Sequence, residues 1–274
     1  MNCRSLLFFP MIACGGRVAD EIEQALWDVN DAIAVSLLVA EPHAWADVEI
    51  STTTTTTTTT PEGTGGTGLD GSAPSGLRHG AAGNCPELTR LEDGVGSYTV
   101  SADYGTGCVS GSGLTPTVLS GSVSIGVVQD QVGINFSSWK ADLSRNVFGT
   151  TNGVLGDEPD TVTVSGNVIL EDAGSFRYEA AVNLSLNLAG DEVQIDGEVN
   201  SVDSDRVQLE GVRIRLSDIP GQCPRPFQGL ATVTGEAPDR VVDFSGGADA
   251  PVEVQRKGRR SQPTPLCAFA SEVF

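Results

Sequence analysis

The chain has 274 residues, with 16 basic and 36 acidic side chains and a net charge of −20. This charge argues against nucleic acid as a partner, because phosphate backbones attract cationic surfaces. No apolar run reaches the roughly 18 residues that a membrane-spanning helix needs, so we expect a soluble body. The 33 glycines and a long threonine run dilute the apolar content, so part of the chain is expected to remain outside the core.

The first 13 residues have the order of an export signal, because Arg4 precedes an apolar block from Leu6 to Ala13. Residues Met11–Cys14 resemble a bacterial lipobox. The resemblance implies that residues 1–13 are removed and that Cys14 is lipidated. Gly15, in place of Asp, then implies an outer-membrane anchor in the cell envelope, facing the periplasm or the surface. The alternative is a buried helix start with a chance cysteine.

Within residues 14–50, apolar side chains recur at helical spacing from Val18 to Ala40, with acidic side chains off that stripe. The pattern predicts one amphipathic acidic helix, which Pro42 ends. Its apolar stripe must pack on the core domain, on a partner or on a second copy of the chain. The sequence leaves these three alternatives open.

Residues 51–84 contain nine consecutive threonines, Thr52–Thr60, followed by Pro, Gly and Ser. Such a composition buries no apolar surface and predicts a disordered linker. A tether suits an anchored protein, whereas the alternative is a low-complexity insertion without function.

Residues 85–274 form the expected main domain, which carries four cysteines: Cys85, Cys108, Cys223 and Cys267. An even number in an exported chain favours two disulfides among three connectivities. We favour the sequential pairs, Cys85 with Cys108 and Cys223 with Cys267. A zinc site is the weaker alternative, because no CxxC pair exists and both histidines, His43 and His79, precede the cysteines.

Apolar and polar residues alternate with a period of two in the main domain, which indicates strands with one buried face and one solvent-exposed face. Short connections join successive strands and predict an antiparallel meander. The expected strands cover residues 98–103, 117–128, 132–138, 162–170, 176–188, 193–199, 207–216, 230–234, 241–244 and 252–255. The fold class is therefore all-β, closing as a curved sheet, sandwich, barrel or half-barrel, preceded by the helix and the linker.

Glycines recur on the apolar faces of these strands and predict a bent sheet. The turns suggested by the sequence pair Gly166 with Ala180 and Gly197 with Gly211, which would align small residues across the sheet. After Gly211 the apolar face shifts from odd to even positions, which predicts a bulge. The alternative is that each glycine only relieves local crowding.

Residues 98–108, which end in Asp-Tyr-Gly-Thr-Gly-Cys, resemble a motif of uncharacterised bacterial envelope lipoproteins. Residues 223–229 and 241–246 are similar to the C-terminal hairpins of the same group. The resemblance implies a secreted β domain with a lipid anchor and brings no activity with it. Asp103 and Tyr104 are therefore interpreted as turn and packing residues.

The sequence predicts a protein that is not an enzyme, because no histidine follows His79 and no pair of carboxylates stands out. No cofactor, metal site or catalytic residue is expected, and a broad aromatic platform for sugars is unexpected because Trp139 is the only Trp of the domain. The first functional hypothesis is a lipid-anchored, non-catalytic β domain for structural or partner-binding roles. The alternative is a carrier or sensor of a lipid-like ligand in a concave sheet. The ligand, the envelope partner and the oligomeric state stay open.

Overall fold

The computed structural model describes residues 16–46 and 85–266, apart from positions 111, 113, 116–117, 142–144, 157–159, 175, 189, 203–204, 216–225, 236–237 and 248–249. The expected signal peptide, Cys14, the linker with His79, Cys223 and Cys267 lie outside the described residues.

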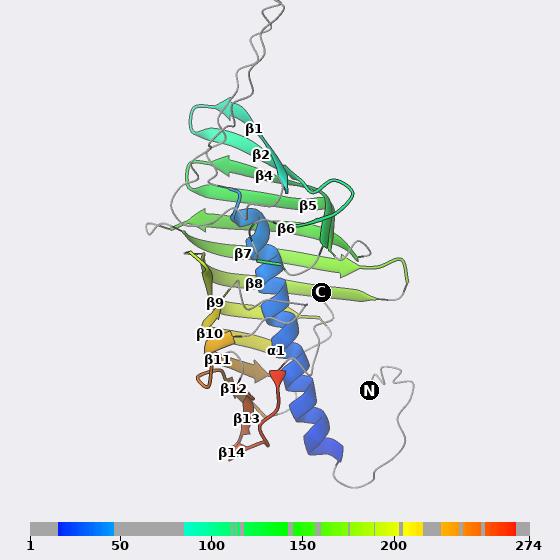
Figure 1. The fold of residues 1–274 in the computed structure, drawn as a ribbon, viewed down its shortest axis with the longest axis vertical. Helices are drawn as coiled ribbons and strands as arrows, with labels where there is room; N and C mark the ends of the chain where they lie inside the picture. Colours follow the sequence, from blue (N-terminus) through cyan, green and yellow to red (C-terminus); the bar gives the residue numbers. More distant parts are fainter. Residues whose placement is uncertain are drawn as a thin grey trace, which may run out of the picture.

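The described residues form one helix and one antiparallel sheet of 14 strands (Figure 1). The strands are β1 (Glu87–Gly94), β2 (Ser97–Asp103), β3 (Cys108–Val109), β4 (Val118–Val128), β5 (Gln131–Ala141), β6 (Arg145–Leu155), β7 (Thr161–Glu171), β8 (Arg177–Asn187), β9 (Glu192–Ser201), β10 (Arg206–Arg215), β11 (Pro226–Thr234), β12 (Arg240–Asp243), β13 (Glu253–Arg256) and β14 (Arg259–Arg260). Each strand pairs with its neighbour in the chain, except that β3 lies beside β4, which pairs with β2. The predicted meander is therefore confirmed, as one open curved sheet instead of a two-sheet sandwich.

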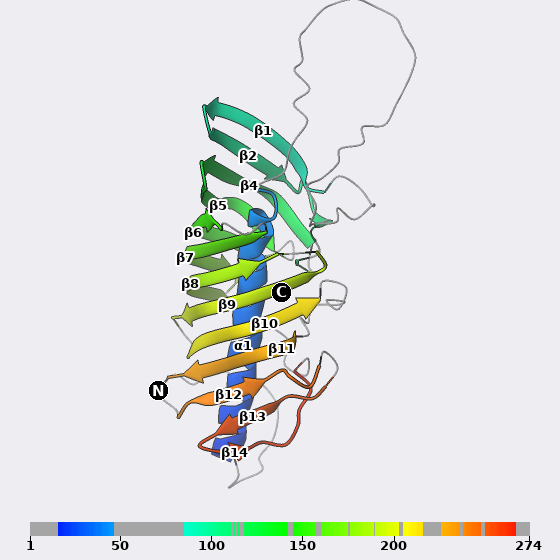
Figure 2. The ribbon, with the colours of Figure 1, turned by 90° about the vertical axis from the view of Figure 1, so that its left-hand side faces the viewer.

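The helix α1 (Gly16–His43) lies across the strands on one face of the sheet (Figures 1 and 2). It contacts β4 and β8 to β12 directly. Of the three packing partners left open by the sequence, the structure thus shows the first, the chain's own β domain. We call the sheet face toward α1 the inner face and the opposite face the outer face.

The helix is buried on every side instead of on one stripe. Every residue from Asp28 to Ala46 is buried, including the carboxylate residues Asp28, Asp31 and Glu41. The amphipathic prediction is therefore wrong for this part of the helix, because acidic side chains assigned to solvent lie inside the protein. A helix buried all round is a core element, and α1 with the inner face of the sheet forms a single core.

Two features of the sheet depend on glycine. At Gly211, which has φ +56°, the pairing of β10 with β9 shifts between Leu209 and Val212, and the predicted bulge is confirmed. At Gly197, with φ +130°, the neighbouring strand approaches so closely that a Cβ would overlap the carbonyl oxygen of Asn183. Such close approaches bend the sheet.

The predicted register of small residues is wrong. Gly166 lies opposite Val182 instead of Ala180, and Gly197 lies opposite Leu209 instead of Gly211. Each hairpin turns one residue away from the expected centre, which moves the partner by two positions. The glycines therefore pair with large residues and form no aligned row.

Candidate functional site

The first predicted disulfide is present and joins Cys85, at the start of the sheet, to Cys108 in β3. Their Cα atoms lie 6.4 Å apart, and the bond closes a sequence separation of 23 residues. It ties the chain just before β1 to the first residue of β3. The Cys223–Cys267 pairing and the lipidation of Cys14 remain predictions.

The sequence did not reveal a buried polar cluster at the end of α1, which we call the Glu41 cluster (Glu41, Trp45, Tyr104, Ser110 and Ser112). The Tyr104 hydroxyl donates to Glu41 Oε1 at 2.9 Å, and Trp45 Nε1 donates to the same oxygen at 3.1 Å. The hydroxyls of Ser110 and Ser112 donate to the two carboxylate oxygens. The cluster thus links the last turn of α1 to the turn after β2 and to the segment after β3.

Burial raises the pKa of the Glu41 carboxyl, and the four hydrogen bonds oppose that rise. Burial also raises the pKa of Tyr104 well above its ordinary value, with a further contribution from the Glu41 charge. Glu41 is fully buried and its oxygens are taken up by donors from the protein itself. The arrangement therefore holds the helix in place and leaves no accessible carboxylate for acid or base chemistry.

A second polar group, the Asp28 cluster (Gln24, Asp28, Asp205 and Arg240), lies near the beginning of α1. Gln24 Nε2 donates to Asp28 Oδ1 at 2.8 Å, and the buried guanidinium of Arg240, from β12, forms an ion pair with Asp205. Burial raises the Asp28 pKa to about 7, and the nearby Asp205 charge adds to the rise while Arg240 opposes it. Arg240 Nη1 also donates to the carbonyl oxygen of Glu21 at 3.3 Å. Both halves of α1 are therefore joined to the sheet by polar contacts.

His43, the last residue of α1, lies against Gly153 of β6. A Cβ on Gly153 would lie 2.7 Å from His43 Cε1, and neither ring nitrogen has a hydrogen-bond partner. Burial lowers the pKa of His43 to about 3, so the ring stays neutral. Without a nucleophile or carboxylate partner, this histidine serves packing instead of catalysis.

The outer face of the sheet carries a groove of about 600 Å³ over β4 to β8. Its walls and floor come from Gly126, Val128, Gln131, Val132, Gly133, Asn152, Gly153, Val154, Thr163, Val164, Ser165 and Asn183. None of these residues is charged or aromatic. None of these residues was predicted as a site from the sequence, although the alternation of buried and exposed residues along the strands places Gly126, Gly133 and the Asn and Ser positions on the outward face.

Among the described residues, no three His, Cys, Asp or Glu side chains gather as metal ligands. The one helix in this part of the chain is not apolar enough over its length to cross a membrane. Comparisons of the chain with protein-family models, with curated proteins and with solved structures found no match. The geometry of the two sheet faces is therefore the basis for proposing a function.

Proposed function

We propose that the chain is a lipid-anchored cell-envelope protein that displays a non-catalytic β domain for structural or partner-binding roles. The observation that supports this proposal is the burial of α1 from Asp28 to Ala46 against the inner face of the sheet. The helix uses the inner face as core, so the outer face is the surface on which a partner can bind.

The polar clusters make this arrangement rigid. Removing α1 would separate Glu41 from Tyr104, Ser110 and Ser112, and it would expose the apolar inner face. Each buried polar group left without a partner costs about 1–3 kcal/mol. These costs favour a domain of fixed shape over one that opens in routine use.

The carrier hypothesis requires the same opening. A lipid-like ligand on the inner face would occupy the space that Leu26, Ile33 and Leu37 of α1 fill. The ligand would have to replace both the packing of the helix and the hydrogen bonds of the Glu41 cluster. The filled inner face therefore supports the display role over the carrier role.

The anchor can be tested with the full chain and its Cys14→Ala variant in a bacterial host. We expect the parent chain in the membrane fraction, with a mature mass that begins at Cys14 and includes acyl chains. The variant should keep its first 13 residues or leave the membrane fraction. Identical processing and fractionation of both chains would refute the anchor.

Native mass spectrometry of the full chain distinguishes a displayed β domain from a carrier of a lipid-like ligand. We expect the mass of the chain with its covalent lipid alone. A further noncovalent mass that disappears on delipidation would show a passenger and favour the carrier instead.

A further inference from the structure

The outer-face groove has a floor made by two facing glycines. Gly126 of β4 lies directly opposite Gly133 of β5, and Gly133 in turn lies opposite Asn152 of β6. The same row continues through Ser165 and Asn183 on β7 and β8. The missing side chains at the two glycines create a trough beside the polar side chains.

Neither glycine is needed for the backbone. Both lack a positive φ, and the nearest atom to an added Cβ is 3.7 Å away at Gly126 and 4.0 Å away at Gly133. This differs from Gly197, where a Cβ would overlap a neighbouring strand. Glycine within a strand costs about 0.5–1 kcal/mol relative to alanine. The two glycines thus lower stability and keep the groove open.

The polar side chains beside the trough are free to bind a ligand. The side chains of Gln131, Asn152, Ser165 and Asn183 make no hydrogen bond or ion pair with any described part of the chain. Amides and a hydroxyl offer both donors and acceptors. Val128 and Val154, which are 58% and 45% exposed, add apolar surface on either side of Gln131.

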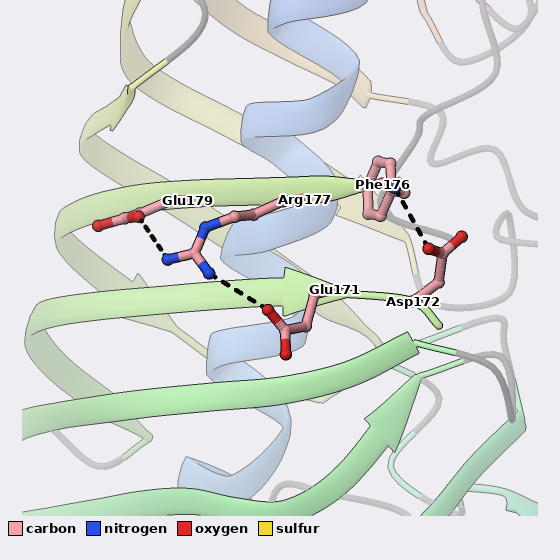
Figure 3. A network of polar contacts seen from close by, with 5 residues as sticks. All are labelled: Glu171, Asp172, Phe176, Arg177 and Glu179. Atoms are coloured by element: carbon pink, nitrogen blue, oxygen red, sulfur yellow. Dashed lines mark hydrogen bonds and ion pairs between the residues drawn. The ribbon is translucent and has the colours of Figure 1, made fainter. Parts of the chain in front are cut away.

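Elsewhere on the outer face, polar side chains bind one another. Arg177 of β8 donates to Glu171 at 3.2 Å and to Glu179 at 3.1 Å, on the face of β7 and β8 shown in Figure 3 with α1 behind the strands. Ser165 and Asn183 lie six residues along the same two strands, about 20 Å from this network. The groove is therefore a neutral region on a protein with a net charge of −20. Its Thr163 hydroxyl donates to the Val154 carbonyl oxygen at 3.4 Å, whereas its amide side chains are unpaired within the described part of the chain.

We propose that this groove binds an uncharged glycan. Its lining carries no charge to hold an anionic or cationic ligand, and its amides and hydroxyls match the hydroxyl groups of sugars. A volume of about 600 Å³ suits a short oligosaccharide segment. No aromatic ring lines the groove, so hydrogen bonds must supply the affinity, and the expected Kd is about 1 mM. The proposal rests on the outer face being displayed and is independent of the lipid anchor.

The test is an NMR titration of the full chain carrying Cys14→Ser, with the side-chain amides of Asn and Gln labelled with ¹⁵N. The probes are cellopentaose, maltopentaose and chitopentaose, each added separately. We expect at least one to shift the Asn152 and Asn183 amide signals in a saturable manner. Gly126→Val and Gly133→Val, which fill the trough, should weaken binding at least about tenfold.

Ala181→Val is the matched control, because Ala181 faces outward on β8 beyond the groove lining. It should bind like the parent chain. If a filled variant fails to unfold cooperatively, Asn152→Ala and Asn183→Ala replace it, because both positions are exposed.

Three outcomes would overturn the glycan site. The first is a folded chain whose amides do not respond to any probe up to about 10 mM. The second is binding that survives in both filled variants. The third is a response to an uncharged extended peptide, added as a fourth probe, without a response to any of the three oligosaccharides, which would assign the groove to a protein partner. None of these outcomes depends on whether Cys14 is lipidated.

Discussion

The hydroxyl of Tyr104, in the turn after β2, donates a 2.9 Å hydrogen bond to the carboxylate of Glu41, 63 positions earlier in α1. Glu41→Gln replaces an acceptor oxygen with an NH₂ group that faces donors, so it should lower the free energy of unfolding by about 2–4 kcal/mol. Tyr104→Phe should lower it by about 1–2 kcal/mol. Urea unfolding at neutral pH measures both changes.

The double variant distinguishes a direct hydrogen bond from two separate effects. The decrease in the free energy of unfolding of Glu41→Gln, added to that of Tyr104→Phe, should exceed the decrease in the double variant by at least about 0.5 kcal/mol. The reason is that the two residues share one interaction. Strict additivity would contradict the cluster as described.

Asp28 should make stability fall as the pH rises. Its pKa is raised from 3.8 to about 7 in the folded protein, so between these values the folded state holds a proton that the unfolded state has lost. The free energy of unfolding should then decrease by about 1.4 kcal/mol per pH unit over that window. Asp28→Asn should remove this slope, and urea unfolding at intervals from pH 4 to pH 8 checks it. An unchanged slope would show that Asp28 is ionised in the fold.

His43 should make stability fall as the pH is lowered, which is opposite to the effect of Asp28. Its pKa is lowered from 6.5 to about 3, so the unfolded state gains a proton first as the pH falls. Stability should decrease by about 1.4 kcal/mol per unit below pH 6.5. His43→Leu should remove that loss, as measured by unfolding at pH 4 and pH 7.

Between pH 3.8 and pH 6.5, Asp28 makes the free energy of unfolding fall as the pH rises and His43 makes it rise, so the two contributions offset each other. The parent chain should therefore show a flatter pH dependence than either single variant. A parent chain steeper than both variants would contradict these assignments.

The same substitution should have opposite effects at two strand glycines. Gly197→Ala places a Cβ against the backbone of Asn183 and 2.8 Å from Leu184 Cα at a φ of +130°, so we expect a loss of about 3 kcal/mol. At Gly126 the nearest atom to an added Cβ is the Gly133 carbonyl oxygen at 3.7 Å, an ordinary van der Waals contact, so Gly126→Ala should be neutral or stabilising by up to about 1 kcal/mol. Thermal unfolding of the two variants compares them, and equal melting temperatures would contradict the difference in packing.

The alternating pattern was enough to predict the strands β7 to β10, because their apolar residues all face one core. The strand β6 was missed, since Gly149, Gly153 and three polar residues, Thr150, Thr151 and Asn152, interrupt its apolar pattern. Its place in the sheet comes from pairing with β5 and β7 instead of from its own composition.

The Glu41 cluster could not be predicted from the sequence. A single carboxylate in an apolar helix gives no signal, and its donors lie more than 60 positions away except for Trp45. The helix pattern likewise placed Asp28 in solvent, because periodicity cannot show that Gln24 and Arg240 will accompany it inside. The groove was missed because alternation predicts which residues face outward but not which of them lack partners.

Helix α1 precedes every strand that buries it. Asn30 donates to the carbonyl oxygen of Leu266, 236 positions later, and Arg240 reaches back to Glu21 over 219 positions. The apolar surface of the helix therefore has no complete partner while the chain is being synthesised. Proteins that depend on contacts of such high sequence separation fold slowly, and their folding intermediates expose apolar surface and are prone to aggregate. Complete burial of α1 consequently has to wait until the chain has been synthesised as far as Leu266.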